Sequence, residues 1–138
     1  MAIVIPDPPR TDPEIDISVE LAVQRANTTW FIEFDPSDII LIPHARVRTA
    51  SGGSTYQAGT PRVEQRFRVL PRSDFEKPLL LDSGKERQID LTLLGEWNCT
   101  MAVGDQWTDA EGQKCEIIEL VPFNGYERKG LVVKHGHG

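Results

Sequence analysis

Apolar and polar residues alternate in several short stretches of the chain. In residues 15–23 every second residue is Ile, Val or Leu, and residues 28–34 repeat the pattern with Trp30, Ile32 and Phe34. A period of two places alternate side chains on one face of an extended strand. Each of the two stretches therefore predicts a half-buried β-strand. Asp35–Asp38 contains Pro36 and three short polar residues, which is typical of a turn.

The next part of the chain predicts a long β-hairpin. Residues 39–49 alternate as a third strand, and Val63, Phe67 and Val69 share one face of a fourth strand. The segment between them is small, polar and glycine-rich, which predicts a mobile loop at the tip. This candidate loop consists of Ser51, Gly52, Gly53, Ser54, Thr55, Tyr56, Gln57, Ala58, Gly59 and Thr60.

Three further strands are expected over residues 88–94, 115–121 and 126–133, with turns at 104–105, 109–112 and 122–125. No stretch of about 12 residues has a convincing helical period. The sequence predicts an all-β fold, a small barrel or sandwich of about six to eight antiparallel strands. Residues 15–134 are expected to form this single domain. Residues 1–14, with four prolines, predict an extended arm, and residues 135–138 a flexible tail.

Charge is distributed unevenly along the chain. The net charge is −6, yet residues 41–72 contain six arginines against Glu64 alone. If the two hairpin strands alternate as described, the arginines project from one layer, and like charges facing each other destabilise a sheet. We therefore expect this layer to meet an acidic neighbour, such as the acidic N-terminal region of a second copy in a ring. A simple solvated face is the alternative. The candidate intersubunit face consists of Arg46, Arg48, Arg62, Arg66 and Arg68.

A search for chemistry finds no catalytic constellation. His135 and His137 lie in the expected tail. Cys99 and Cys115 lack the spacing of a metal site. A chain of this size needs no disulfide, so two reduced thiols are expected. Residues 105–116 fail as a calcium loop because Ala110 stands where the turn requires glycine. We expect no enzyme, no cofactor and no metal. The prolines near the N-terminus and the short apolar runs also predict no export signal and no membrane partner.

Residues 39–138 resemble a known family. The resemblance depends on the hairpin with its glycine-rich tip, on Val103–Ile118 with its Gly-Asp, turn and β-run, and on Tyr126–Gly136. These segments are similar to the small head–tail joining proteins of long-tailed bacteriophages, also called head-closure or stopper proteins. Tyr126–Gly136 is similar to versions from actinobacterial phages. The acidic, proline-rich N-terminus departs from the pattern of that family.

The resemblance implies a β-barrel that assembles as a ring, a hexamer or dodecamer, beneath the portal and its adaptor protein. Such a ring closes the channel after DNA packaging and gives the tail a docking platform. The implied partners are further copies of the chain, the adaptor, tail-terminator or tail-tube proteins, and packaged DNA near the loop 51–60. The implied location is the neck of the virion, assembled in the host cytoplasm. The family implies no cofactor and no catalytic residue.

Two other functions remain open. The chain could be a tail-completion or tail-terminator protein of the same virion, because the same β-rich sequence would serve there. It could also be an OB-like barrel that binds nucleic acid, with arginines along the phosphates and Tyr56 or Phe67 stacking on bases. Phe67 counts against the second function because it falls on the apolar face of its strand. An enzyme is the last of these hypotheses.

Overall fold

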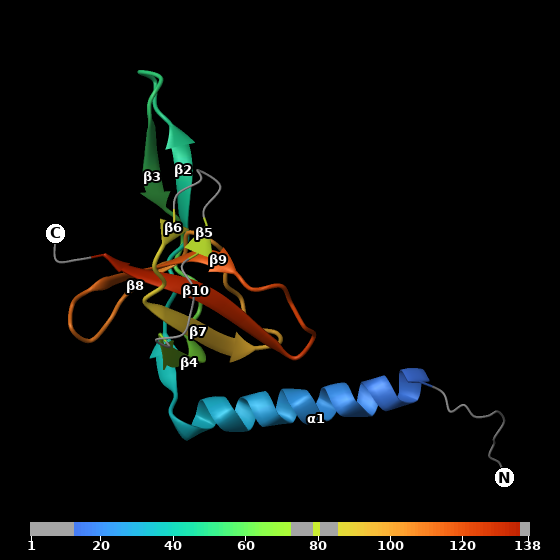
Figure 1. Cartoon of the computed structure of the whole chain (residues 1–138). Helices are drawn as coiled ribbons and strands as arrows, with labels where there is room; N and C mark the ends of the chain where they lie inside the picture. The colour runs from blue at the N-terminus through green and yellow to red at the C-terminus, as the bar shows by residue number, and fades with distance from the viewer. Residues whose placement is uncertain (1–12, 73–78, 81–85, 136–138) are drawn as a thin grey trace, which may run out of the picture.

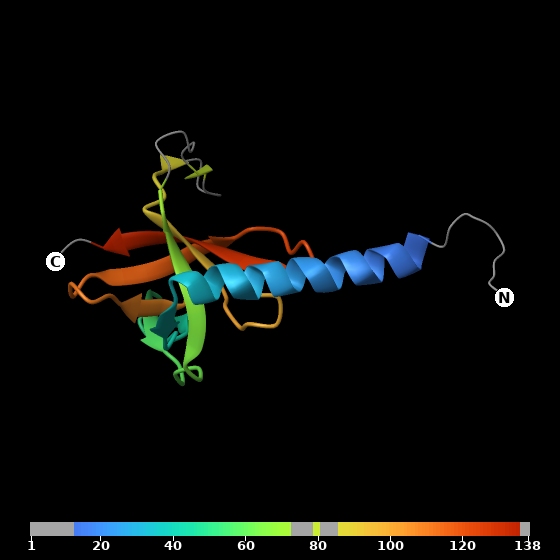
Figure 2. The ribbon, with the colours of Figure 1, turned by 90° about the horizontal axis from the view of Figure 1, so that it is seen from below.

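The fold combines one long helix, a barrel-like sheet and a projecting hairpin. The structure is a computed structural model that describes residues 13–72, 79–80 and 86–135. Figure 1 shows the helix α1 (Pro13–Phe34) along one side of the sheet. The hairpin of β2 (His44–Arg48) and β3 (Ser54–Ala58) extends away on the other side. In Figure 2 the N-terminal half of α1 continues beyond the barrel.

The main sheet has six antiparallel strands and is nearly closed. Its order is β1 (Ser37–Ile39), β4 (Gln65–Pro71), β7 (Leu91–Glu96), β10 (Glu127–His135), β9 (Lys114–Leu120) and β8 (Gln106–Thr108). Ile42, just after β1, exchanges two backbone hydrogen bonds of 2.9 and 3.0 Å with Gln106 of β8. These bonds connect the two edges of the sheet. The predicted mostly β, barrel-like fold is confirmed.

Two small sheets complete the β-structure. One is the hairpin β2–β3, and the other pairs β5 (Leu79–Leu80) with β6 (Glu86–Arg87). The predicted strands 88–94, 115–121 and 126–133 correspond to β7, β9 and β10. The predicted turn at 109–112 joins β8 to β9, and the turn at 122–125 joins β9 to β10. Gly112 and Gly125 have φ of 85° and 96° there, which glycine adopts without strain.

Alternating residues of the sheet fill the interior of the barrel. Phe67, Leu93 and Ile117 are fully buried, on β4, β7 and β9. Gly95 allows this packing, because a Cβ there would lie 2.9 Å from the Phe67 ring and 2.5 Å from the Cys99 sulfur. The buried core cluster is Ile39, Leu41, Phe67, Leu91, Leu93, Trp107, Cys115, Ile117 and Val132.

The prediction of two strands over residues 15–23 and 28–34 is wrong, because both stretches lie in α1. Ile32 and Thr28 on the inner face are buried, whereas Trp30 and Phe34 on the outer face are exposed. A helix that is apolar on two sides loses the one-sided period by which helices are identified from sequence. The helix ends before Pro36, since a proline disfavours helical geometry in the preceding residue.

The chain ends are also corrected where the structure describes them. Pro13 and Glu14, expected in the extended arm, belong to α1, and residues 1–12 lie outside the described residues. His135, expected in the flexible tail, is the last residue of β10, and its Nε2 lies 2.7 Å from the Glu116 carboxylate. Residues 136–138 lie outside the description. Within the described residues, no helix has both the length and the apolar character that crossing a bilayer requires.

Candidate assembly surfaces

The five arginines of the expected basic face do not share one face. Arg62 pairs with a buried carboxylate, Arg66 with two carboxylates, and Arg68 lies against α1. Only Arg46 and Arg48 lie on the hairpin β2–β3. The prediction of a single basic layer is wrong because Arg62, Arg66 and Arg68 contact groups of their own chain.

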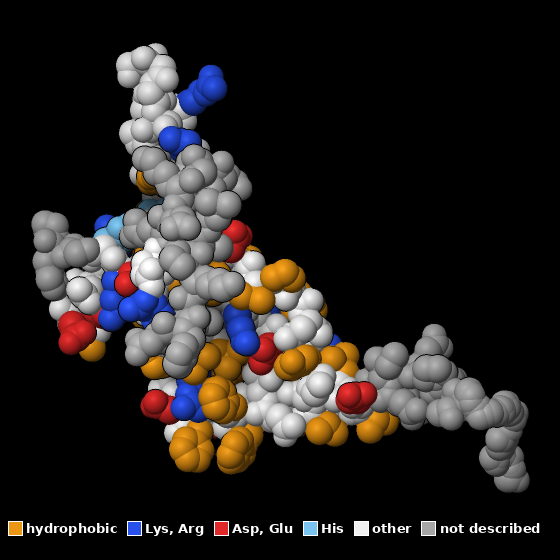
Figure 3. Space-filling view, in the orientation of Figure 1, with side chains coloured by type: hydrophobic (Ala, Val, Ile, Leu, Met, Phe, Trp, Pro, Cys, Tyr) orange, Lys and Arg blue, Asp and Glu red, His pale blue; other side chains and the backbone are white. Residues whose placement is uncertain are grey.

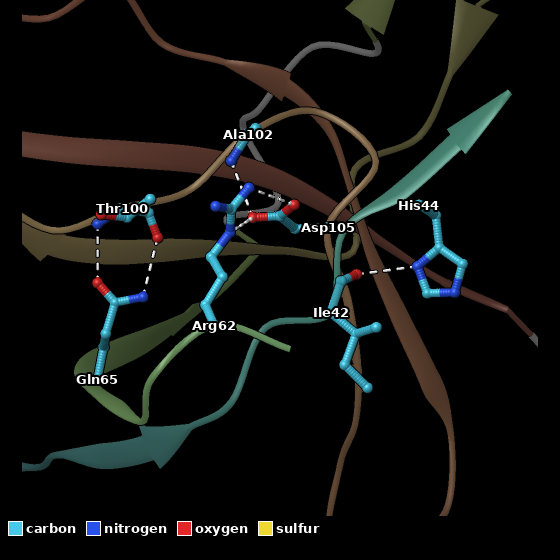
Figure 4. A network of polar contacts seen from close by, with 7 residues as sticks. All are labelled: Ile42, His44, Arg62, Gln65, Thr100, Ala102 and Asp105. Carbon is cyan, nitrogen blue, oxygen red and sulfur yellow. Dashed lines mark hydrogen bonds and ion pairs between the residues drawn. The ribbon is translucent and has the colours of Figure 1, made fainter. Parts of the chain in front are cut away.

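Arg62 connects two loops at one end of the barrel. Its Nε and Nη2 donate to the Asp105 carboxylate at 2.9 and 3.1 Å, as Figure 4 shows. The Asp105 side chain is 1% exposed and also accepts a hydrogen bond from the Ala102 amide at 3.0 Å. A buried carboxylate needs such partners, because an uncompensated charge in the interior is costly. This pair is structural, so Arg62 does not belong to an intersubunit surface.

Other close contacts lie in the same region as the Arg62–Asp105 pair. Gln65 exchanges two hydrogen bonds with the backbone of Thr100, at 2.8 and 2.9 Å (Figure 4). Gly104 has φ of 97°, and a Cβ there would lie 2.7 Å from the carbonyl oxygen of His44, at the base of the hairpin. The turn before β8 therefore supports the position from which the hairpin leaves the barrel.

Arg66 and Arg68 attach α1 to β4. Arg66 donates to Glu33 at 2.8 and 2.9 Å and to Asp38 at 3.0 Å. These two carboxylates raise the pKa of Arg66, through hydrogen bonds to Glu33 first and to Asp38 next. The Arg68 guanidinium lies 3.9 Å from the centre of the Phe31 ring and donates to the Phe31 carbonyl at 2.9 Å.

The candidate loop 51–60 is largely a strand. Ser54–Ala58 forms β3, which pairs with β2 in the register Arg48↔Ser54, Arg46↔Tyr56 and His44↔Ala58. The predicted partner of the third strand, residues 63–69, instead pairs with β1 and β7. The tip is the short turn after β2, where Gly52 has φ of 92°. The predicted hairpin of residues 39–49 with residues 63–69 is therefore wrong, and so is its ten-residue tip. The hairpin that projects from the barrel is built from residues 44–58 instead.

One face of the hairpin combines two arginines with a tyrosine. Residues two apart on a strand, and residues opposite each other across an antiparallel pair, lie on the same face. Arg46, Arg48, Ser54 and Tyr56 therefore share a face, and all four are exposed. Within the described part of the chain, neither arginine forms an ion pair. The Nε of Arg46 instead donates to Ser54 Oγ at 2.9 Å.

The outer side of α1 carries a row of exposed apolar side chains. Val19, Val23, Trp30 and Phe34 are 62%, 53%, 67% and 72% exposed. Their spacing of 4, 7 and 4 residues places them within a narrow stripe on a helix of 3.6 residues per turn. We call these four residues the outer stripe. Hydrophobic side chains gather over α1 along the lower edge of Figure 3.

The inner side of α1 contacts the barrel through polar and aromatic groups. Arg25 lies 3.8 Å from the centre of the Trp97 ring and donates to the Gly125 carbonyl at 3.0 Å. The Thr29 hydroxyl donates to the Glu96 carboxylate at 2.5 Å. These contacts fix the helix with its inner side to the barrel, so the outer stripe faces away from it.

A groove lies where the two edges of the barrel-like sheet meet. Its volume is about 780 Å³, it follows the seam between β1 and β8, and Asp38, His44, Glu64, Asp109 and Lys114 are among its lining residues. Hydrogen bonds from the amides of Gln113 and Glu111 and the nearby Lys134 lower the pKa of Asp109, which suits a turn residue. No group of three or more His, Cys, Asp or Glu in the described residues is placed to hold a metal ion.

Both cysteines are thiols in apolar surroundings. Cys115 is fully buried and Cys99 is partly buried beside Gly95. Burial raises the pKa of each thiol to about 11. A thiol with so high a pKa carries little thiolate at neutral pH and is a poor nucleophile or metal ligand.

Neither a known protein family nor a curated protein matches this chain. Two exposed surfaces bear on function: the hairpin face, which consists of Arg46, Arg48, Ser54 and Tyr56, and the outer stripe. Sequence reasoning identified Arg46, Arg48 and Tyr56 but missed the outer stripe. The sequence does contain a signal for the outer stripe. Its members, Val19, Val23, Trp30 and Phe34, are 4, 7 and 4 residues apart, and this spacing places side chains on one side of a helix.

Proposed function

We propose that this chain is a structural subunit of the ring that joins the head of a phage to its tail. The ring closes the portal channel after DNA packaging, contacts the adaptor on the portal side and gives the tail a docking platform. The resemblance in residues 103–118 and 126–136 supports this function. Those residues include the β8–β9 hairpin and β10 of the barrel-like sheet.

The outer stripe of α1 is the observation that carries the proposal. Four large apolar side chains lie in one stripe of a helix that continues beyond the barrel, and all four are exposed to water. The rings of Trp30 and Phe34 lie side by side, with centroids 5.6 Å apart. Contiguous exposed apolar surface on a soluble protein usually marks an interaction site. A subunit that functions in a permanent assembly covers such a surface.

The occupant that we propose is the barrel of a second copy. Glu20 is exposed beside the outer stripe, and Glu33 on the other side is already paired with Arg66, so two stripes facing each other would offer the Glu20 carboxylates no basic partner. A contact between the stripe and a different surface of the next copy can provide one. Such a head-to-tail contact generates a ring when its rotation closes.

A pair of variants tests the contact. Trp30→Glu with Phe34→Glu places two charges on the outer stripe, and Ser18→Glu with Ala22→Glu places the same charges at exposed positions of α1 outside the stripe. Native mass spectrometry and light scattering at increasing concentration measure assembly. We expect the wild type and the control to form rings and the stripe variant to remain monomeric. Equal assembly of both variants contradicts the stripe contact.

Cryo-electron microscopy of the particle that carries this chain tests the function itself. The proposal predicts a ring of this chain in the neck, between portal and tail, with α1 in contact with the adjacent copy. Density for the chain at the end of a free tail would favour a tail-completion or tail-terminator protein. Of the two aromatic residues considered for base stacking, Phe67 is fully buried, which weakens the alternative of an OB-like barrel.

A further inference from the structure

The seam of the barrel-like sheet exposes the backbone edge of β8. Successive residues of an antiparallel strand direct their backbone groups to opposite sides in turn. Asp105 and Asp109, which flank β8, bond toward β9 at 2.9 Å in each case. The backbone of Gln106 and of Thr108 therefore faces the opposite side, where Gln106 bonds to Ile42.

Pairing between the two edges of the sheet stops at the bridge between Ile42 and Gln106. In the same register the next pair would be Ile40 with Thr108, but no backbone hydrogen bond joins these two described residues. Both residues line the groove of about 780 Å³ at the seam. A strand edge with unpaired N–H and C=O groups is a template for a further strand.

The lining of the groove also offers apolar contacts. Of its residues, Ile39 and Trp107 are buried and Val69 is partly buried, whereas Ile40 is 47% exposed. A strand that adds to a sheet edge gains affinity from main-chain hydrogen bonds and specificity from contacts of its alternate side chains. The seam provides both, so a short extended segment with apolar side chains fits it best.

The chain contains such a segment outside the described residues. Residues 2–5 read Ala-Ile-Val-Ile and carry no charge. β-Branched residues such as Ile and Val favour strands. Pro6 has no amide donor for a ladder and therefore limits the run to these four residues.

This segment falls short of the groove in its own subunit. The 22 residues of α1 make a helix about 33 Å long, and its N-terminal half continues beyond the barrel (Figure 2). The groove, in contrast, includes Ser37 and Asp38, just after the C-terminal end of α1. The chain from Ile5 to Pro13 spans at most about 29 Å when fully extended. A second copy is therefore the better source of the segment.

We propose that residues 2–5 of one copy add as a strand to the edge of β8 in the next copy, beside Thr108. The added backbone bonds to Thr108 at the position that Ile40 leaves open, and its side chains cover the apolar lining of the groove. The inference rests on the proposed function in taking the next subunit of the ring as the source of the strand. The contact also covers a sheet edge, and edges left open favour aggregation.

Disulfide trapping between full-length chains tests the inference. One chain carries Ile3→Cys, Val4→Cys or Ile5→Cys, the other carries Thr108→Cys, and each pair is mixed and oxidised. We expect a linked pair with one chain of each kind, because paired strands bring Cα atoms within the roughly 4.4–6.8 Å that a disulfide requires. Mass spectrometry identifies the link. The native Cys99 and Cys115 compete little, because burial raises the pKa of each to about 11.

A second cysteine position provides the matched control. Glu119 is exposed on β9 and does not line the groove, so chains with Glu119→Cys should not link to the same partners. Equal linking of Thr108→Cys and Glu119→Cys overturns the inference, because random collision would then be sufficient. A single chain with Val4→Cys and Thr108→Cys that closes an internal disulfide instead of linking copies also overturns it.

Hydrogen exchange of the Thr108 amide tests the backbone pairing itself. We expect this amide to be protected in concentrated wild-type protein and to lose its protection in Val4→Pro, because proline interrupts the added strand. Thr11→Pro places a proline outside the run and should keep the protection. Protection that is absent from the wild type, or unchanged in Val4→Pro, contradicts pairing with residues 2–5.

The two proposals fail separately. If the ring forms in the neck but residues 3–5 do not link to Thr108→Cys, the strand inference alone is wrong. If the link forms between copies but the chain is absent from the neck, the connector function is wrong and the strand contact stands.

Discussion

The hairpin and the barrel use arginine in opposite ways. On the barrel side, Arg62, Arg66 and Arg68 each contact a partner within the chain, and Arg62 reaches a carboxylate that is almost fully buried. On the hairpin, Arg46 and Arg48 are exposed and form no ion pair with any described residue. Five arginines within 23 residues of sequence therefore separate into a structural group and an available group. Arginines that are close together in the sequence therefore need not form one charged surface in the fold.

The largest expected effect concerns Arg62. Arg62→Gln leaves the Asp105 carboxylate buried without its ion pair, and breaking a buried pair typically costs about 3–5 kcal/mol. Because the Arg62 side chain is 24% exposed, we expect the lower end, a loss of about 3 kcal/mol in the free energy of unfolding. Urea denaturation measures the loss. Asp105→Asn is the companion variant, and the double variant should lose less than the sum of the two.

The rate at which Cys115 is labelled by a thiol reagent gives a second measure of the effect of Arg62→Gln. The raised pKa of Cys115, about 11, and its burial protect it from thiol reagents at neutral pH. An unfolded thiol has a pKa of about 8.5 and carries far more thiolate. Arg62→Gln should therefore speed labelling at pH 7. Unchanged stability and labelling would mean that the barrel-side pair is dispensable, and the contrast between the two groups would disappear.

A smaller effect is expected for Arg68, which attaches α1 by one carbonyl and one aromatic ring. Arg68→Gln should cost about 1 kcal/mol, since cation–π contacts at accessible sites contribute about 0.5–1 kcal/mol and single hydrogen bonds a similar amount. Hydrogen exchange should show faster opening in the last turns of α1 than in β7 and β10. Arg72→Gln, at an exposed position just after β4, serves as the control and should leave exchange in α1 unchanged.

Part of the barrel was predictable because a strand with one buried and one exposed face alternates in sequence. In β9, Cys115 and Ile117 are buried, and Glu116 and Ile118 are less so, which reproduces the period of two in the sequence. The turn residues Gly112 and Gly125 were visible for the same local reason, their need for positive φ. Where local chemistry alone determined the structure, the sequence was sufficient to predict it.

Three features depend on information that a local pattern lacks. In α1, apolar residues on the outer stripe and on the inner face together imitate the alternation of a strand. The strand β3 has no buried residue, so its exposed pattern resembles a loop. The pair Arg62–Asp105 joins residues 43 positions apart, and only the folded chain brings them together. The candidate site was therefore only partly predictable, in the residues of the hairpin.

The smallest effect on stability is expected on the hairpin. Arg46→Gln with Arg48→Gln should change the free energy of unfolding by less than about 0.5 kcal/mol, because exposed side chains without tight partners rarely contribute more. The bond from Arg46 to Ser54 is exposed, so water replaces it at little cost. Thermal or urea unfolding of this double variant and of Arg68→Gln under the same conditions compares their losses in the free energy of unfolding. A loss larger than that of Arg68→Gln would show that the hairpin arginines stabilise their own chain, and they would then not be available to a partner.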